Sequence, residues 1–512
     1  MKKTASIALL LALSLTLTGC TKEQAPQPQA EATLPPAQQR FEVPTAMSDM
    51  GYTREVPLYL PATDGSRLLC VYETLSLRHD QPAAPAIAQA LLTHPRTKTT
   101  DTVGSGTAIN LFGEMPVEVA AGVATVNLTS SALSMESSAL YKAALSITAT
   151  LCQQGNIHHV NILIADQAPG LDITGNLPMG ALTPHPGEDL KALWELQDAK
   201  RTPLGESAEN TPYTGAVTLY FPMADGSGVV PEIRTLNFAG QTALQQTETI
   251  LSALSKGAMY TENAAVMPDL QQLMTKAIRV SDNPSGGRII HLTFGEDTIA
   301  ALSESGIDFT CVMASLVMSV TTHVPGVSAL TVTLGSEPLT GLMMPDDSRA
   351  EFSDGLLRRR AFSGTLRESV SICLAEGELL TTVQRTVPAS QAVSPAWLMM
   401  LLSQGPTWQE ENTGIGGLLP QPLTGEDLLG ASVEGDTLVL NLSCRTSEII
   451  RGLTPLQERL FCYAVVGTMC QSLDVKKVAF LFEGEMVESL AGGLFWGGTF
   501  MPNPGLASQS KG

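Results

Sequence analysis

Eight cysteines and seven histidines are the side chains of this 512-residue chain best suited to bind a metal or act as nucleophiles. They form no CxxC pair, no HExxH motif and no cysteine–histidine spacing typical of a zinc site. His158 and His159 are adjacent on a predicted strand, where neighbouring side chains point to opposite faces and cannot hold one metal together. The sequence therefore predicts no metal site and no cofactor.

Acidic residues recur at one place in a repeated pattern, because Asp64, Asp225 and Glu376 each precede a glycine. An acidic residue before glycine has a sufficient conformational reason in a tight turn. The glycine-containing stretches at Gly104 and Gly414 lack the lysine and Ser/Thr of a phosphate-binding loop, and no GxSxG elbow occurs. We expect no catalytic residue, and hence a protein that is not an enzyme.

The first residues have the pattern of an export signal. Lys2 and Lys3 precede an apolar stretch from Ile7 to Leu17 that is too short to span a bilayer permanently. No later stretch reaches the roughly 18 consecutive apolar residues of a spanning helix. Everything after Cys20 is therefore expected outside the cytoplasm.

Leu17-Thr18-Gly19-Cys20 resembles the bacterial lipobox, in which the cysteine is acylated, for example with palmitate, and becomes the new N-terminus. The alternative is a free cysteine that merely falls near a cleavage site. Two acyl chains suffice for stable anchoring where one is marginal. The resemblance implies lipidation of Cys20 and attachment to the extracytoplasmic face of the cell membrane. The Pro-, Gln- and Ala-rich residues that follow predict a disordered tether.

Seven further cysteines follow Cys20, and an odd number rules out complete pairing within the chain. Most lie in apolar runs, which favours buried free thiols that pack as small hydrophobic groups. A disulfide among the cysteines of the last third of the chain is the alternative. The seven are Cys70, Cys152, Cys311, Cys373, Cys444, Cys462 and Cys470.

The formal net charge of -20 makes nucleic acid an unsuitable partner, since phosphate binding needs a basic face. Arg358 to Arg360 form the one compact basic run. A solvated linker explains this run, and a contact with anionic lipid is the alternative.

One pattern is written three times along the chain. "VPLYLPATDG" begins at Val56, "VTLYFPMADG" at Val217 and, more faintly, "ESVSICLAEG" at Glu368. Each predicts a strand that enters a tight turn, and a second strand, an amphipathic helix, a hairpin, a second amphipathic helix and a last strand follow. The order β-β-α-β-β-α-β predicts α+β domains in which two helices cover one face of a small sheet.

These patterns predict the domain organisation. It comprises a lipoprotein signal peptide (1–19), the lipidated cysteine and tether (20–55), a first domain (56–175), a linker (176–216), a second domain (217–341), a linker (342–367), a third domain (368–492) and a C-terminal tail (493–512). Each domain of about 120 residues is long enough to bury its own core. The relative arrangement of the domains does not follow from the sequence.

Asn127, His291 and Asn441 occupy what the pattern indicates is one position, on the sheet face opposite the buried residues. If that face is the outer one of a sheet, it could pair with a neighbouring domain or subunit. Ordinary solvent-facing residues are the simpler interpretation.

The repeats resemble the GerM domain of sporulation and spore germination proteins. The matching stretches are "LYFPMADGSGVVPEIRTL", "LLSQGP", "DTLVLNLS" and "VAFLFEGEMVESLAG". The resemblance implies three tandem copies in a lipoprotein of the cell envelope that acts in sporulation or germination. GerM domains are also similar to the ring-building motif of secretion-system rings, which would make them assembly modules.

Two hypotheses follow. The first is a non-catalytic, lipid-anchored scaffold whose partners are the membrane, through the N-terminal lipid, and envelope or sporulation proteins, with self-assembly as one alternative. The second is a solute- or glycan-binding lipoprotein, or a cell-wall hydrolase, with a pocket between domains. Sugar binding would place aromatic residues in that pocket, so the positions of Trp408 and Trp496 discriminate between the two.

Overall fold

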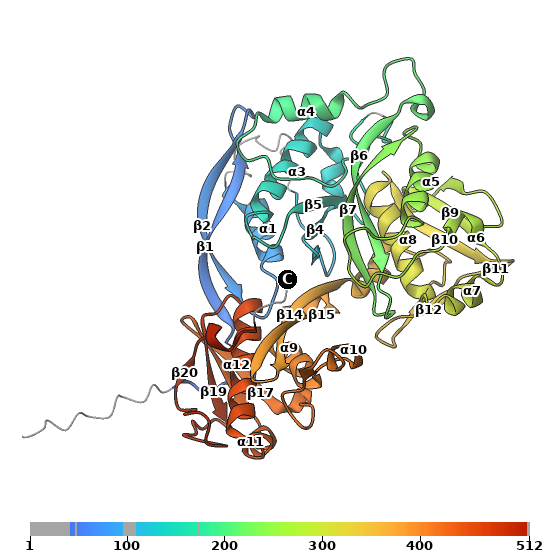
Figure 1. Cartoon of the computed structure of the whole chain (residues 1–512). Helices are drawn as coiled ribbons and strands as arrows, with labels where there is room; N and C mark the ends of the chain where they lie inside the picture. Colours follow the sequence, from blue (N-terminus) through green and yellow to red (C-terminus); the bar gives the residue numbers. More distant parts are fainter. Residues whose placement is uncertain (1–40, 47–48, 96–108, 173, 509–512) are drawn as a thin grey trace, which may run out of the picture. The chain divides into compact units, whose positions relative to one another are not determined.

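A computed structural model describes residues 41–46, 49–95, 109–172 and 174–508 (Figure 1). All of them belong to one unit, Phe41–Gly512. The predicted signal peptide, Cys20 and the tether as far as residue 40 lie outside the described residues, as does the stretch at Gly104. Those predictions remain predictions.

The elements fall into three segments. The first contains β1 (Gly51–Pro61), β2 (Leu68–Arg78), α1 (Ala84–Thr93), β3 (Val117–Ala120), β4 (Val123–Leu128), η2 (Ser130–Ser134), α3 (Ser137–Leu151), β5 (His159–Ile164) and α4 (Leu190–Asp198). The second contains η3 (Ala208–Asn210), β6 (Tyr213–Pro222), β7 (Val229–Phe238), α5 (Ala243–Leu254), α6 (Leu270–Leu273), β8 (Arg279–Asp282), β9 (Arg288–Phe294), α7 (Thr298–Glu304), α8 (Phe309–His323), β10 (Val327–Leu334), β11 (Glu337–Pro338), β12 (Gly341–Met343), β13 (Arg349–Glu351) and η4 (Arg359–Thr365). The third contains β14 (Arg367–Glu376), β15 (Leu379–Pro388), η5 (Ala389–Gln391), α9 (Pro395–Gln404), α10 (Trp408–Glu411), β16 (Ile415–Gly416), η6 (Gly425–Asp427), β17 (Leu428–Glu434), β18 (Thr437–Leu442), α11 (Cys444–Arg451), α12 (Pro455–Ser472), β19 (Lys477–Phe482), β20 (Thr499–Phe500) and η7 (Pro504–Leu506).

The mixed α+β class predicted from the sequence is confirmed, but the strands of each segment are divided between separate sheets, two in the first and third segments and three in the second, where β12 and β13 form a small additional pair. Long antiparallel hairpins, β1–β2, β6–β7 and β14–β15, form one sheet of each segment, and β16 adds to the third. The second sheets have the orders β3-β4-β5, β8-β9-β10-β11 and β17-β18-β19-β20. Each second sheet contains one parallel pair, β4–β5, β9–β10 or β18–β19.

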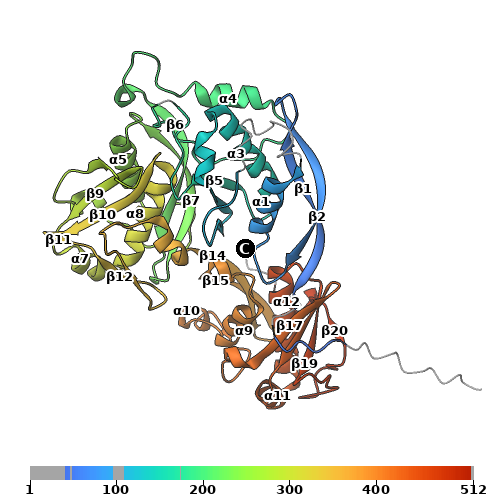
Figure 2. The same cartoon turned by 180° about the vertical axis from the view of Figure 1, so that it is seen from behind.

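A long helix lies between the hairpin and the second sheet of each segment, and Figure 2 shows the same layers from behind. These helices are α3, α8 and α12. The sequence predicted both helices on one face of a single sheet, which is wrong because the long helix is covered on two sides. Every residue of α8 is buried.

Helix hydroxyls explain how polar residues tolerate this burial. In each segment a Ser or Thr of the long helix bonds to the backbone of the first hairpin strand, which satisfies polar groups that would otherwise be buried without partners. The backbone N–H of Tyr59 donates to the Thr150 hydroxyl (2.9 Å) and that of Tyr220 to the Ser319 hydroxyl (3.0 Å). In the third segment the backbone N–H of Cys373 donates to the Thr468 hydroxyl (3.0 Å). A helix prediction based on the spacing of apolar residues does not include these polar contacts.

Three hydrophobic clusters correspond to the three segments. The predicted linkers and the C-terminal tail add to them: Leu190 and Leu193 of α4 join the first cluster, Phe352 and Phe362 the second, and Trp496 of the tail the third. The domain boundaries themselves stay a prediction. Among the described residues, no single helix is long and apolar enough to cross a bilayer, and α7 and α8 reach that length only as a pair bent by 109°.

Residues 41–46, here called the strap, were expected inside a disordered tether that ended at residue 55. The structure instead places them on the second sheet of the third segment, where Phe41 packs with Val439, Ala479 and Leu481. Strand β1 then begins at Gly51. Only Phe41 and Pro44 of the strap are buried, so its composition differs little from that of the polar residues before it. For that reason the sequence shows no boundary at residue 41.

Candidate functional site

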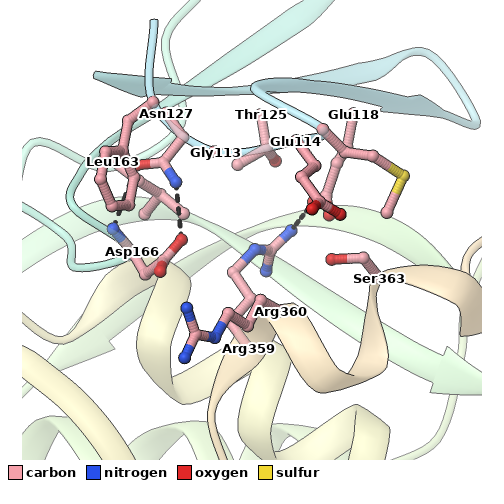
Figure 3. Close-up of a pocket in the computed structure, with 12 residues that line it drawn as sticks. Gly113, Glu114, Glu118, Thr125, Asn127, Leu163, Asp166, Arg359, Arg360 and Ser363 are labelled. Carbon is pink, nitrogen blue, oxygen red and sulfur yellow. Dashed lines mark hydrogen bonds and ion pairs between the residues drawn. The ribbon is translucent and has the colours of Figure 1, made fainter. Parts of the chain in front are cut away.

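A pocket of about 350 Å³ lies where the second sheet of the first segment meets η4 of the second (Figure 3). We call it the junction pocket. One wall comes from the loop before β3, with Phe112, Glu114 and Met115, and from the outer faces of the β3–β5 sheet. The opposite wall comes from Arg359, Arg360 and Ser363.

Arg359 fixes this junction. Its guanidinium lies 2.6 Å from Glu118 of β3 and donates to the Tyr220 hydroxyl (3.1 Å) and to the Thr322 hydroxyl (2.6 Å). Only 3% of the residue is exposed. Although burial disfavours the charged form, Tyr220 and Glu118 hold the pKa of Arg359 above its usual value. A buried guanidinium with partners in both segments locks the first and second segments together.

The three arginines of the basic run therefore have three roles. Arg358 pairs with Asp354 at 2.6 Å, and Arg359 is buried at the junction. Arg360 is exposed and lines the junction pocket, and none of the described carboxylates lies within 4.0 Å of its guanidinium. A solvated linker describes Arg358 and Arg360 but is wrong for Arg359. The sequence held no signal for this, since Glu118 is 241 residues away.

Asn127 lines the pocket and holds the turn after β5. Its side-chain amide donates to Asp166 (2.6 Å), and its carbonyl oxygen accepts from the backbone N–H of Asp166 (3.1 Å), as Figure 3 shows. Ala165 and Asp166 have φ of 48° and 66°, the left-handed values of a two-residue hairpin turn. The amide compensates for this unfavourable backbone.

Asn441 holds the corresponding turn in the third segment. Its carbonyl oxygen accepts from Gly484 N–H (2.8 Å), in the turn after β19. Its amide donates to the backbone carbonyl of Pro44 in the strap (3.0 Å). The interpretation of Asn127 and Asn441 as solvent-facing is wrong, because both are buried and their faces are covered by other parts of the chain.

His291 does not share their position. The carbonyl of Phe294 accepts from Gly335 N–H, as that of Leu128 accepts from Ala165 N–H, so Thr293 is the counterpart of Asn127. The predicted alignment of the second segment was two residues out of register. His291 lies between the hydroxyls of Ser281 (2.7 Å) and Thr331 (2.8 Å).

His158 and His159 both line a second cavity, of about 590 Å³, to which all three segments contribute. Glu368 of β14 also lines it and accepts from the backbone N–H of Ala121 in the β3–β4 turn (2.9 Å). Burial raises the pKa of the Glu368 carboxyl. No group of three potential metal ligands occurs within the described ranges.

Two of the three recurring acidic residues, Asp64 and Asp225, act in turns, as predicted. Asp64 accepts from Ser66 N–H (3.0 Å) and Asp225 from Ser227 N–H (2.9 Å). The hydrogen bonds from Ser66 lower the pKa of Asp64. The Asp64 and Asp225 carboxylates therefore stabilise the backbone of their own turns.

The tryptophans do not form a sugar-binding platform at the cavities described here. Trp496 is fully buried and donates to Glu458 (2.7 Å), whereas Trp408 is 75% exposed on α10. The seven described cysteines are free, so the alternative of a disulfide is wrong. Burial raises the pKa of Cys152 to about 11.

Comparisons with known proteins identify two related regions. Residues 57–169 and 375–488 match a family model named Germane and described as sporulation and spore germination, so the resemblance found in the sequence is confirmed for these two regions. No curated protein matches the chain. Among solved structures, tandem GerMN domains of the sporulation protein GerM from Bacillus subtilis match at 17% identity, over 56% of this chain and 96% of that chain, with a TM-score of 0.21. A protein from Clostridium perfringens described as a lipoprotein matches at 20% identity, over 27% of this chain and 87% of that chain, with a TM-score of 0.19.

Proposed function

Since residues 57–169 and 375–488 match the Germane family model of sporulation and spore germination, we propose that this protein is a lipid-anchored, extracytoplasmic assembly component of the cell envelope in that process. The family is not known for enzymatic activity, which supports a non-catalytic role. In this proposal the middle segment is a third, divergent copy of the same ring-building-motif-like module, since its elements follow the same order.

The observation that carries the assembly role is the way the segments are joined. Arg359 is buried between the first and second segments with Glu118 and Tyr220, and Thr218 of β6 donates to Asn161 of β5 (2.9 Å). Glu368 ties the β3–β4 turn to the third segment. A binding protein that closes on a solute needs a hinge, whereas buried ties of this kind favour a rigid body that presents surfaces.

The anchoring part of the proposal rests on the lipobox-like sequence at Cys20. It is tested in sporulating cells that express the wild-type chain or Cys20→Ala. We expect the wild type in the membrane fraction, labelled by a palmitate analogue, and the variant unlabelled and soluble, with fewer heat-resistant spores. Equal spore numbers for the wild type and a deletion strain would contradict the proposed process, and labelling of the variant would contradict the anchor.

The assembly part is tested by light scattering and small-angle scattering of the chain from Thr21 onwards over a concentration series. Growth to a closed or linear oligomer supports self-assembly. A monomer at all concentrations rules out self-assembly and directs the search to protein partners by pull-down from sporulating cells.

A further inference from the structure

We propose that the junction pocket binds an extended, proline-containing peptide segment of a partner protein, in the way the third segment holds the strap of its own chain. The choice of a protein partner rests on the assembly role proposed above. The site itself rests on contacts within this chain and would stand without that role.

The pairing registers make the two sites equivalent. Strand β4 pairs with β5 from Val123–His159 to Leu128–Ile164, and β18 pairs with β19 from Thr437–Lys477 to Leu442–Phe482. Asn127 therefore corresponds to Asn441, and Leu163 to Leu481. Asp166 and Gly484 both occupy the second position of the turn that follows.

In the third segment this site is filled by backbone that runs across the outer face of the sheet. Pro44 is buried and its carbonyl accepts from Asn441 (3.0 Å), while the Ala46 carbonyl accepts from Ala431 N–H (3.3 Å) and Glu42 N–H donates to Glu434 (2.8 Å). Val43 lies against Gly484. The strap shows what kind of ligand this face accepts: extended chain with apolar side chains and a proline.

The junction pocket offers the same groups without a strap. Leu163 provides the apolar floor that Leu481 provides to the strap, and Phe112 and Met115 add apolar walls. An Asn side chain has two amide protons. One of those on Asn127 goes to Asp166, which leaves the other for the carbonyl of a ligand.

Arg360 gives this pocket a selectivity that the strap site lacks. Its guanidinium is exposed at the pocket wall, and none of the described acidic groups forms an ion pair with it. A guanidinium without a partner favours a carboxylate with bidentate geometry. The peptide is therefore expected to carry an acidic residue near its proline, as the strap carries Glu42 two positions before Pro44.

The probe is a fluorescein-labelled peptide with the sequence of residues 41–46, Phe-Glu-Val-Pro-Thr-Ala, titrated onto the chain from Thr21 onwards. Ser363→Trp fills the pocket from a half-buried position, and circular dichroism verifies that the variant is folded. The matched control is Asn441→Ala, which weakens the strap site and leaves the junction pocket unchanged.

Binding that is abolished by Ser363→Trp and retained by Asn441→Ala supports the proposal. Arg360→Glu is then expected to weaken binding about tenfold, and a peptide with Gln in place of Glu is expected to be insensitive to that change. Binding lost in Asn441→Ala but retained in Ser363→Trp would show that the peptide only replaces the strap, and the proposal would be wrong.

Two further outcomes also overturn it. Saturating peptide without any change in anisotropy means that the pocket does not take this ligand class. A doubling of mass without peptide, abolished by Ser363→Trp, means that a second copy of the chain occupies the pocket. Neither outcome affects the spore counts that test the proposed function, so the two failures are distinguishable.

Discussion

The second sheets of the first and third segments pair in the same register, but their outer faces are covered in different ways. The first is covered by the second segment, whose Arg359 forms a buried ion pair with Glu118. The third is covered by the strap, held by neutral hydrogen bonds and by the packing of Phe41. Removing the buried charge of Arg359 from the first face should therefore cost much more free energy of unfolding than removing a neutral hydrogen bond from the third face.

The largest effect is expected from the first face. Arg359→Ala leaves Glu118 at the junction without its partner, and breaking a buried pair by removing one side costs about 3–5 kcal/mol. The free energy of unfolding, measured with urea by fluorescence, reports the loss. Arg358→Ala is the matched control, because its pair with Asp354 is partly exposed and is worth about 1 kcal/mol or less. Equal losses for the two variants would mean that Arg359 is not a structural anchor.

A pH dependence should separate the second segment from the third. His323 is buried between Phe238 and Tyr213, and burial lowers its pKa to about 3. The unfolded chain, with a pKa near 6.5, binds the proton first, so stability present above pH 6.5 is lost as the pH falls towards 3. The third segment contains no histidine.

Calorimetry at pH 7 and pH 4.5 measures this difference. The wild type is expected to lose about 2–3 kcal/mol between the two pH values from His323 alone. His323→Gln keeps a hydrogen-bonding partner for Tyr213 and removes the titration, so its loss over the same interval should be smaller by that amount. An unchanged pH dependence in the variant would assign the acid sensitivity to other groups.

How far the sequence predicted these features depends on whether the contacts are local. Hairpins β3–β4, β8–β9 and β17–β18 follow from alternation and turn residues, and Gly405, with φ of 75°, ends α9 by local backbone conformation. Buried Ser and Thr on the long helices have no such signal, because their partners lie on a hairpin about 90 residues away. The division of each segment into separate sheets was missed for that reason.

The site was harder to predict than the elements. The Asn-containing strand ends of the first and third segments were found as one position, but the second segment was aligned two residues early, since "RIIHL" matches the alternation as well as "IHLTF" does. Arg359 and the strap depend on partners 241 and almost 400 residues away. No periodicity encodes such pairings.

A substitution outside the strap should be enough to displace it. A Cβ on Gly430 would meet the Pro44 carbonyl at a distance that real Cβ atoms do not reach. Gly430→Ala should therefore push the strap off β17 at a cost of about 1–3 kcal/mol. Hydrogen exchange at Ala431 N–H, which donates to Ala46, should be faster in the variant. Gly425→Ala is the control, because nothing lies within 4 Å of its added Cβ.

The smallest effect tests the comparison most directly, because it removes the same side chain from both faces. Asn441→Ala leaves the Gly484 N–H and the Pro44 carbonyl under the strap without their partner, and a buried polar group without a partner costs about 1–3 kcal/mol. Asn127→Ala frees the N–H and the carboxylate of Asp166 beside an open pocket, where water can replace the amide. Asn441→Ala should therefore be the more destabilising by about 1 kcal/mol in urea unfolding. Equal losses would mean that the junction pocket excludes water as the strap does, and that its walls close on each other when no ligand is bound.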